Sequence, residues 1–155
     1  MAYKVTRDQI VAAAMECLGW KFRHQGRNKD ENHEIDCVGL LVVVGQRIKY
    51  PEIFDVEGYR RVPSANVIRT TLEKNLDEIP VAEARRGDIY LMRLGGIKPR
   101  HAAIRISDET DLKKGIEPQL IHAFALGKGG TVRIESVRQR KDDIAAAFRI
   151  RGLVD

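Results

Sequence analysis

Hydrophobic and polar positions at the start of the chain follow the pattern of a helix. Thr6 and Gln9 have the spacing of a capping box, in which a hydroxyl and an amide satisfy the free N–H groups of the first turn. Apolar residues then recur at helical intervals, at Ile10, Ala13, Ala14, Cys17 and Leu18. The pattern predicts a helix that begins after Thr6 and ends at Gly19.

A second apolar segment, residues 35–44, is hydrophobic on all sides. Periodicity alone cannot distinguish a buried helix from a buried strand in such a run. Asp36 is a good N-cap residue, which favours a helix that begins at Cys37. A third helix is predicted after Ser64, a further N-cap candidate, with its apolar positions at Val67, Ile68 and Leu72.

The pattern changes after Pro80, where short alternating segments replace the helical spacing. They cover residues 88–94, 100–107, 119–125, 131–137 and 146–151, and Gly, Pro, Asp and Lys separate them. Residues 23–34 are almost wholly polar and residues 50–63 contain Pro and Tyr, so both are expected to be loops. Helices followed by strands predict one α+β domain over residues 1–155, with a mainly antiparallel sheet.

Composition excludes several classes of protein. Hydrophobic residues are 43% and charged residues 32% of the 155, which fits neither a disordered tail nor a membrane protein. No apolar stretch approaches the roughly 20 residues that span a bilayer. The N-terminal region has no signal-peptide pattern, so we expect synthesis in the cytoplasm without a leader. The net charge of +5 suits an anionic partner, but aromatic residues are only 6% and form no base-stacking pattern, so nucleic acid is not expected.

Only two cysteines occur, Cys17 and Cys37, and a reducing compartment is expected for such a chain. Cys17 lies on the apolar face of the first predicted helix and is interpreted as a core residue. Cys37 directly follows an N-cap candidate, where free N–H groups and the helix dipole favour a thiolate. Cys37 is therefore a candidate nucleophile, although a small residue in an apolar run is also simply a core residue.

Two of the four histidines lie on neighbouring predicted strands. His101 begins the segment 101–106, in which Ala102, Ile104 and Ile106 alternate on one face and His101 and Ala103 share the other. His122 lies within the next segment, 119–124. Histidines on successive strands can be cross-strand neighbours close enough to hydrogen-bond. With a cysteine at a helix start, they fit a nucleophile, a base and a group that orients the base.

These residues resemble three sequence blocks of the NlpC-type papain-like cysteine peptidases. The blocks are Asp36-Cys37-Val38-Gly39-Leu40, then Arg86-Gly87-Asp88-Ile89-Tyr90 leading to His101-Ala102-Ala103-Ile104, and finally Ile121-His122-Ala123. Arg23-His24-Gln25-Gly26-Arg27 and Phe148-Arg149-Ile150-Arg151-Gly152 resemble the branch found in bacteriophage tails and gene-transfer agents. Together the blocks span residues 18–152, nearly the whole chain.

The resemblance implies hydrolysis of peptide bonds in bacterial peptidoglycan through a Cys-His-His triad. Cys37 would be the nucleophile, His101 the general base and then acid, and His122 the group that orients His101. The backbone N–H of Cys37 would donate to the oxyanion, with Asp36 in support. No cofactor and no metal is implied. The implied partners are peptidoglycan stem peptides and phage tail proteins, and a phage or prophage tail particle would deliver the protein to the cell wall.

The chain departs from the family at one position near the cysteine. Many relatives have a Tyr whose hydroxyl faces the thiol, whereas this chain has Phe22, which cannot donate. His24 or Gln25 is the candidate to supply that hydrogen bond. The departure keeps open a second hypothesis, in which the protein is a non-catalytic structural component of a phage-like tail. A third is an amidase or acyltransferase of the same fold with a substrate outside the wall.

Other motifs have simpler interpretations. Cys17, His24, His33 and Cys37 match no common zinc spacing. Residues 127–130 are Gly-Lys-Gly-Gly, but they lack the end of a phosphate-binding loop and are predicted to be a hairpin turn. Six basic residues surround His101 in sequence: Arg85, Arg86, Arg93, Lys98, Arg100 and Arg105. They form either a solvated face or a surface that attracts the carboxylates of stem peptides.

Overall fold

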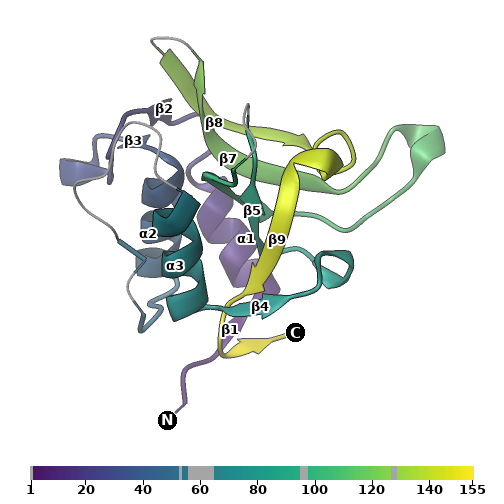
Figure 1. Cartoon of the computed structure of the whole chain (residues 1–155), viewed down its shortest axis with the longest axis horizontal. Helices are drawn as coiled ribbons and strands as arrows, with labels where there is room; N and C mark the ends of the chain where they lie inside the picture. Colours follow the sequence, from purple (N-terminus) through teal and green to yellow (C-terminus); the bar gives the residue numbers. More distant parts are fainter. Residues whose placement is uncertain (1, 53, 56–64, 95–97, 127–128) are drawn as a thin grey trace.

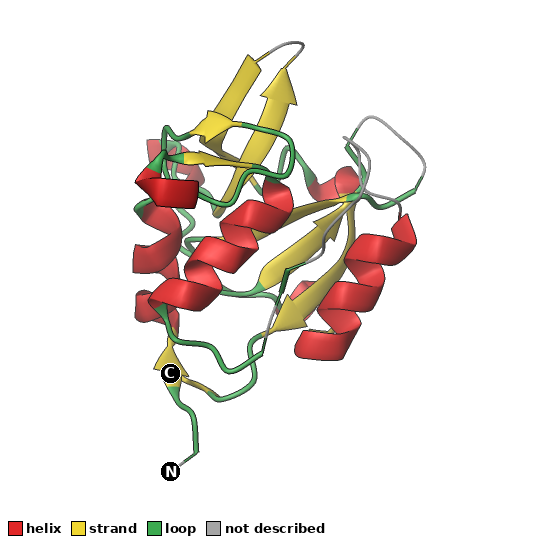
Figure 2. Ribbon diagram, turned by 90° about the vertical axis from the view of Figure 1, so that its left-hand side faces the viewer, coloured by secondary structure: helices red, strands yellow, loops and turns green. Residues whose placement is uncertain are grey.

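The computed structural model describes residues 2–52, 54–55, 65–94, 98–126 and 129–155. Within these residues three α-helices lie beside a curled, mainly antiparallel sheet (Figures 1 and 2). The helices are α1 (Arg7–Met15), α2 (Cys37–Arg47) and α3 (Ala65–Asn75). The strands are β1 (Val5–Thr6), β2 (Lys21–Phe22), β3 (Glu34–Ile35), β4 (Asp77–Ile79), β5 (Ile89–Met92), β6 (His101–Arg105), β7 (Gln119–Leu126), β8 (Gly129–Ser136), β9 (Ile144–Arg149) and β10 (Leu153–Val154). The predicted α+β class is confirmed.

The eight strands of the main sheet are ordered β3-β2-β8-β7-β6-β5-β9-β4. Only the β2–β3 pair is parallel among the neighbours in this sheet. A separate parallel pair, β1 with β10, brings the two ends of the chain together at the bottom of Figure 1. The described helices include none that is long and apolar enough to cross a membrane.

Helix α1 begins where the capping box predicted. The Thr6 hydroxyl accepts from the backbone N–H of Gln9 at 3.1 Å, and the Gln9 side chain accepts from the N–H of Thr6 at 2.8 Å. The predicted end at Gly19 is wrong, because the helix ends at Met15. The amides of Cys17 and Leu18 bond only three residues back, to Ala14 and Met15, so the chain tightens before Gly19 turns left-handed at φ +84°.

Helix α2 begins at Cys37 as predicted. The Asp36 side chain accepts from the backbone N–H of Gly39 at 2.8 Å and caps the helix. Most of the helix is buried, which explains why its sequence is apolar on all sides. The third predicted helix is also present, but its proposed cap, Ser64, lies outside the described residues.

The five predicted strands correspond to β5, β6, β7, β8 and β9, with each end shifted by at most two residues. Strands β7 and β8 pair antiparallel from Gln119↔Ser136 to Leu126↔Gly129, as a hairpin requires. Of the predicted turn 127–130, Gly129 and Gly130 belong to β8, and residues 127–128 lie outside the described residues. The polar segment 23–34 was predicted to be loop throughout, but β3 begins in it at Glu34. Two-residue strands such as β2 and β3 carry no readable alternation, so the sequence did not predict them.

Alternation along β6 divides its residues between two apolar clusters. Ala102, Ile104 and Ile106 join the large core that includes the helices, and Ala103 joins a smaller cluster with Tyr90 and other residues. This confirms the predicted division of β6. The strand that carries His101 is therefore packed on both faces.

Asp88, in the second sequence block, has a structural role. The side chain is fully buried and accepts from Arg149 Nη2 at 2.8 Å and from the backbone N–H of Arg85 at 2.9 Å. Arg7 Nη1, itself 3% exposed, lies 3.3 Å away. Asp88 thus connects α1, β9 and the start of β5, and it fixes the strands that support β6.

Candidate active site

Cys37 occupies the N-terminus of α2 and is 5% exposed. Its sulfur accepts hydrogen bonds from the backbone N–H of Ala102 in β6 and from that of Val38 in its own helix. Ala102 follows His101 directly. The packing of α2 on β6 therefore brings the thiol to the peptide that joins His101 to Ala102.

The environment of Cys37 favours the neutral thiol. Burial, followed by the charge of Asp36, raises the pKa of the thiol to about 12. The two backbone N–H groups and the more distant Arg27 act in the opposite direction but are outweighed. The helix N-terminus was expected to stabilise a thiolate, and here desolvation is the stronger effect. Cys17 is fully buried, as predicted for a core residue, and burial raises its pKa to about 12 as well.

The two strand histidines are in direct contact. Nε2 of His101 lies 2.7 Å from Nδ1 of His122, and the two rings are nearly perpendicular at 76°. The neighbouring antiparallel strands β6 and β7 carry them. This contact leaves Nδ1 as the remaining ring nitrogen of His101.

Both imidazoles favour the neutral form. Burial lowers the pKa of His122 to about 4, and the charges of Arg133 and Arg140 act in the same direction against that of Glu135. Burial, with the neighbouring His122 and Arg140, places the pKa of His101 well below its ordinary value. At neutral pH a neutral pair of rings needs one donor and one acceptor at the 2.7 Å contact.

Glu135 on β8 is the residue of this cluster that sequence reasoning missed. Its Oε2 lies 3.5 Å from Nε2 of His122, and its Oε1 lies 2.7 Å from Nη2 of Arg133. Arg140 donates to Glu135 from its Nε. Strands β7 and β8 hold these groups on one face of the hairpin, where Arg133 stands opposite His122. The register of the β7–β8 hairpin is the information that would have predicted Glu135 as a neighbour of His122.

Asp36 connects the cysteine helix to the polar segment before it. One carboxylate oxygen caps Gly39, and the other accepts from the backbone N–H of Gln25 at 2.9 Å. Arg27 donates to Asp36 at 2.9 Å and to Asp55 at 2.8 Å. Asp36 therefore holds both the start of α2 and the loop over it.

The remaining predicted site residues lie in or beside this loop. Phe22 is half-buried on β2, pairs with Ile35 of β3 and packs against the main core. Gln25 is exposed and has a left-handed backbone at φ +56°, and its backbone N–H is the group that contacts Asp36. His24 is half-buried. The donor role suggested for His24 or Gln25 stays a prediction.

Some of the basic residues near His101 in sequence form ion pairs with acidic side chains. Arg105 lies 3.0 Å from Asp108 and donates to the Tyr90 hydroxyl at 3.1 Å. Arg86 pairs with Asp8 and with Asp108, at 3.2 and 3.6 Å. These contacts favour the interpretation of a structural, solvated face for these two residues of the group.

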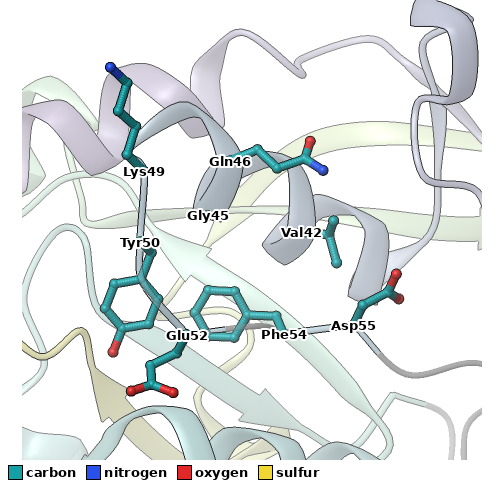
Figure 3. Close-up of a pocket in the computed structure, with 8 residues that line it drawn as sticks. All are labelled: Val42, Gly45, Gln46, Lys49, Tyr50, Glu52, Phe54 and Asp55. Carbon is teal, nitrogen blue, oxygen red and sulfur yellow. The ribbon is translucent and has the colours of Figure 1, made fainter.

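A pocket of about 250 Å³ lies beside the C-terminal half of α2, where Tyr50 and Phe54 stack (Figure 3). It is lined by Val42, Gly45, Gln46, Lys49, Tyr50, Glu52, Phe54 and Asp55. Neither the thiol nor the histidine pair lines this pocket. Among the described residues no group of three or more His, Cys, Asp or Glu side chains is placed to hold a metal ion.

Cys37 therefore lies at a helix N-terminus against the strand that carries His101, within an α+β fold. Comparison with solved structures identifies the NlpC/p60 type of this fold. The NlpC/p60 domain of the peptidoglycan hydrolase SagA has 23% identity and a TM-score of 0.61, and the match covers 94% of this chain and 100% of that one. An NlpC/p60 family protein from Bacillus cereus has 15% identity and a TM-score of 0.64, over 95% of this chain and 41% of that one.

NlpC2 from Trichomonas vaginalis is similar at 18% identity and a TM-score of 0.64, over 93% of this chain and 46% of that one. This chain thus spans less than half the length of these two longer relatives, and the whole length of the SagA domain. No protein-family model and no curated protein sequence matches. The predicted NlpC-type fold is confirmed by structure.

Proposed function

We propose that the protein is a cysteine peptidase or amidase that hydrolyses peptide bonds of bacterial peptidoglycan. One observation supports this most directly: the Cys37 sulfur meets the backbone of β6 beside His101, whose ring is bonded to His122 at 2.7 Å. The NlpC/p60 fold and its likeness to a peptidoglycan hydrolase domain give the substrate class.

In the proposed reaction Cys37 attacks the carbonyl carbon of a stem-peptide bond, and the thiol proton moves to Nδ1 of His101. The new sulfur–carbon bond gives a tetrahedral oxyanion, which the backbone N–H of Cys37 stabilises. His101 then gives its proton to the leaving amine, and a thioester remains on the sulfur. Water attacks the thioester while His101 takes its proton, and transfer of that proton restores the thiol. His122 orients the ring of His101.

Digestion of purified peptidoglycan tests this proposal. The wild type is expected to release peptide fragments that mass spectrometry identifies, and Cys37→Ala and His101→Ala are expected to release none. Cys17→Ala is the matched control, because it removes the other buried thiol, which lies just after α1. Fragments also identify the bond that is cut. Release by Cys37→Ala at the wild-type rate would refute the assignment.

The alternative is a structural component of a phage-like tail that keeps the fold without catalysis. Phe22 in place of a hydroxyl donor and the small exposure of Cys37, 5%, favour this hypothesis. No fragment release by a folded wild type, on walls from several bacterial classes, would support it. Activity on a soluble acyl substrate but not on wall material would instead support an amidase with a substrate outside the wall.

We also propose that a phage or prophage tail particle carries the protein from the cytoplasm to the wall. The resemblance of residues 23–27 and 148–152 to the tail branch supports this proposal. Mass spectrometry of purified particles is the test: the protein should co-purify with tail proteins. Its recovery only from particle-free cytosol would contradict the proposal.

A further inference from the structure

His122 has two ring nitrogens in different surroundings. Nδ1 contacts His101 at 2.7 Å, while Nε2 faces the Glu135 carboxylate at 3.5 Å. The side chain of His122 is fully buried, and within the described residues its Nε2 makes no shorter polar contact that satisfies it as a hydrogen bond. A buried ring nitrogen in this position directs its hydrogen toward the nearest negative charge it faces.

The Glu135 carboxylate is kept ionised. Burial opposes ionisation, but the hydrogen bond from Arg140 and the charges of Arg140 and Arg133 lower the pKa of the carboxyl below its usual value. Arg133 contacts one oxygen at 2.7 Å, and Arg140 donates to the other. An ionised carboxylate can only accept, so the group that faces Nε2 of His122 is an acceptor.

The two arginines also limit what Glu135 does to the ring. A lone carboxylate beside an imidazole favours the protonated, positively charged ring. Here burial, and after it the positive charges of Arg133 and Arg140, act against that form and lower the pKa of His122 to about 4, so the ring is neutral at neutral pH. Glu135 therefore selects which nitrogen carries the single hydrogen and does not charge the ring.

The position of the hydrogen on His122 determines its position on His101. With its hydrogen on Nε2, His122 has a lone pair on Nδ1 and can only accept there. The 2.7 Å contact then requires His101 to donate from Nε2. The remaining nitrogen of His101, Nδ1, is left with a lone pair, as a base for a thiol requires.

We infer that Glu135 is a positioning residue, which sets the tautomers of His122 and His101 so that Nδ1 of His101 is the basic nitrogen. This inference rests on the proposed cysteine hydrolase for its role in catalysis. The tautomers themselves are a property of the folded protein and are measurable without any substrate.

Nitrogen-15 NMR of the histidine rings tests the inference at neutral pH. The chain has four histidines, so single substitutions assign each signal. In the wild type both His101 and His122 are expected to carry hydrogen on Nε2. Hydrogen on Nδ1 of either ring in the wild type would overturn the inference, whatever the variants do.

Glu135→Ala is expected to give mixed tautomers at both rings. Asp143→Ala is the matched control, because Asp143 lies 3.3 Å from the same Arg140 and the structure gives it no contact with His122. The control is expected to keep the wild-type tautomers, as is Glu135→Asp if its carboxylate still reaches the ring. Unchanged tautomers in a folded Glu135→Ala would refute the role of Glu135.

Kinetics separate this inference from the proposed function. Glu135→Ala is expected to lower kcat on peptidoglycan by about 10- to 100-fold, the usual effect of losing a group that orients a histidine, with KM nearly unchanged. If the wild type cleaves no peptidoglycan while its tautomers respond as expected, the proposed function fails and the inference stands. A wild type that cleaves while Glu135→Ala shows full kcat would leave the function intact and overturn the inference.

Discussion

Gly39, in the first turn of the cysteine helix, is predicted not to tolerate substitution by alanine. A Cβ built there would lie 2.1 Å from the Gly26 carbonyl oxygen and 3.0 Å from the Ile35 Cβ. The oxygen belongs to the backbone, so the two groups must separate by about 1.3 Å or more to reach ordinary contact distance. Gly26 is itself closely packed, because a Cβ on Gly26 would lie 2.7 Å from the Glu34 carbonyl oxygen and 2.9 Å from that of Arg23.

Gly45 in the same helix is the matched control for Gly39→Ala. A Cβ there meets only the ring of Phe54, at 3.1 and 3.2 Å, and a side chain can move by a few tenths of an ångström. Both substitutions gain the helix preference of alanine, about 1 kcal/mol. Overpacking against fixed backbone costs about 3 kcal/mol at the upper end of its usual range. Gly39→Ala should therefore lose about 2 kcal/mol net, and Gly45→Ala should be neutral or slightly stabilising.

Urea unfolding measures this difference. Circular dichroism follows the whole fold, and Trp20, the single tryptophan, reports on the loop because its ring stacks on His33 at 4.5 Å. For a chain of this size 2 kcal/mol corresponds to about 4–8 °C in Tm. Gly39→Ala should also lower peptidoglycan hydrolysis, since the displaced loop is anchored on Asp36 beside Cys37. Equal stability of the two variants would refute this account of Gly39.

Three further results are expected. In the folded protein the pKa of His122 is lowered to about 4, against 6.5 for an ordinary histidine. Acidification over that interval therefore protonates the unfolded chain first and removes about 3 kcal/mol of stability, a loss that His122→Gln should abolish in urea unfolding at pH 7 and 4. Asp36→Asn keeps the helix cap but loses a charge that raises the pKa of Cys37, so iodoacetamide should alkylate Cys37 several-fold faster at pH 8. Asp88→Ala removes the buried carboxylate that Arg7 and Arg149 share and leaves Arg7 only Asp155 and the Arg86 carbonyl as partners, so it should cost about 3 kcal/mol in the same unfolding assay.

The start of α2 could be predicted because its cause is local. Asp36 and Gly39 are three residues apart, and the cap needs only that spacing. The sequence could not predict the end of α1, because Gly19 is held by a distant partner, with its N–H donating to the Val132 carbonyl at 2.9 Å. Strands of two residues, such as β2, likewise depend on their neighbours across the sheet and have no pattern of their own.

The distinction between features with a local cause and features that depend on distant partners also applies to the candidate site. Cys37, His101 and His122 stand in recognisable local settings, a helix start and two strands, so the sequence indicated them. Glu135 becomes a neighbour of His122 only through the register of the β7–β8 hairpin, in which Arg133 faces His122. A register that differed by one residue would turn Glu135 to the other face. Residue types and spacing do not contain that information until the turn is fixed.

Burial gives the site its resting charge state. It raises the pKa of the Cys37 thiol to about 12 and places that of His101 well below its ordinary value, so both changes keep the proton on sulfur. The backbone N–H groups of Ala102 and Val38 favour the thiolate but are outweighed. These shifts favour the neutral thiol and the neutral imidazole over a thiolate–imidazolium pair. In the proposed mechanism the proton must then leave sulfur as the carbon–sulfur bond forms, which makes a correctly placed lone pair on His101 more important than a high pKa of its ring. A residue that fixes the histidine tautomers serves that requirement directly.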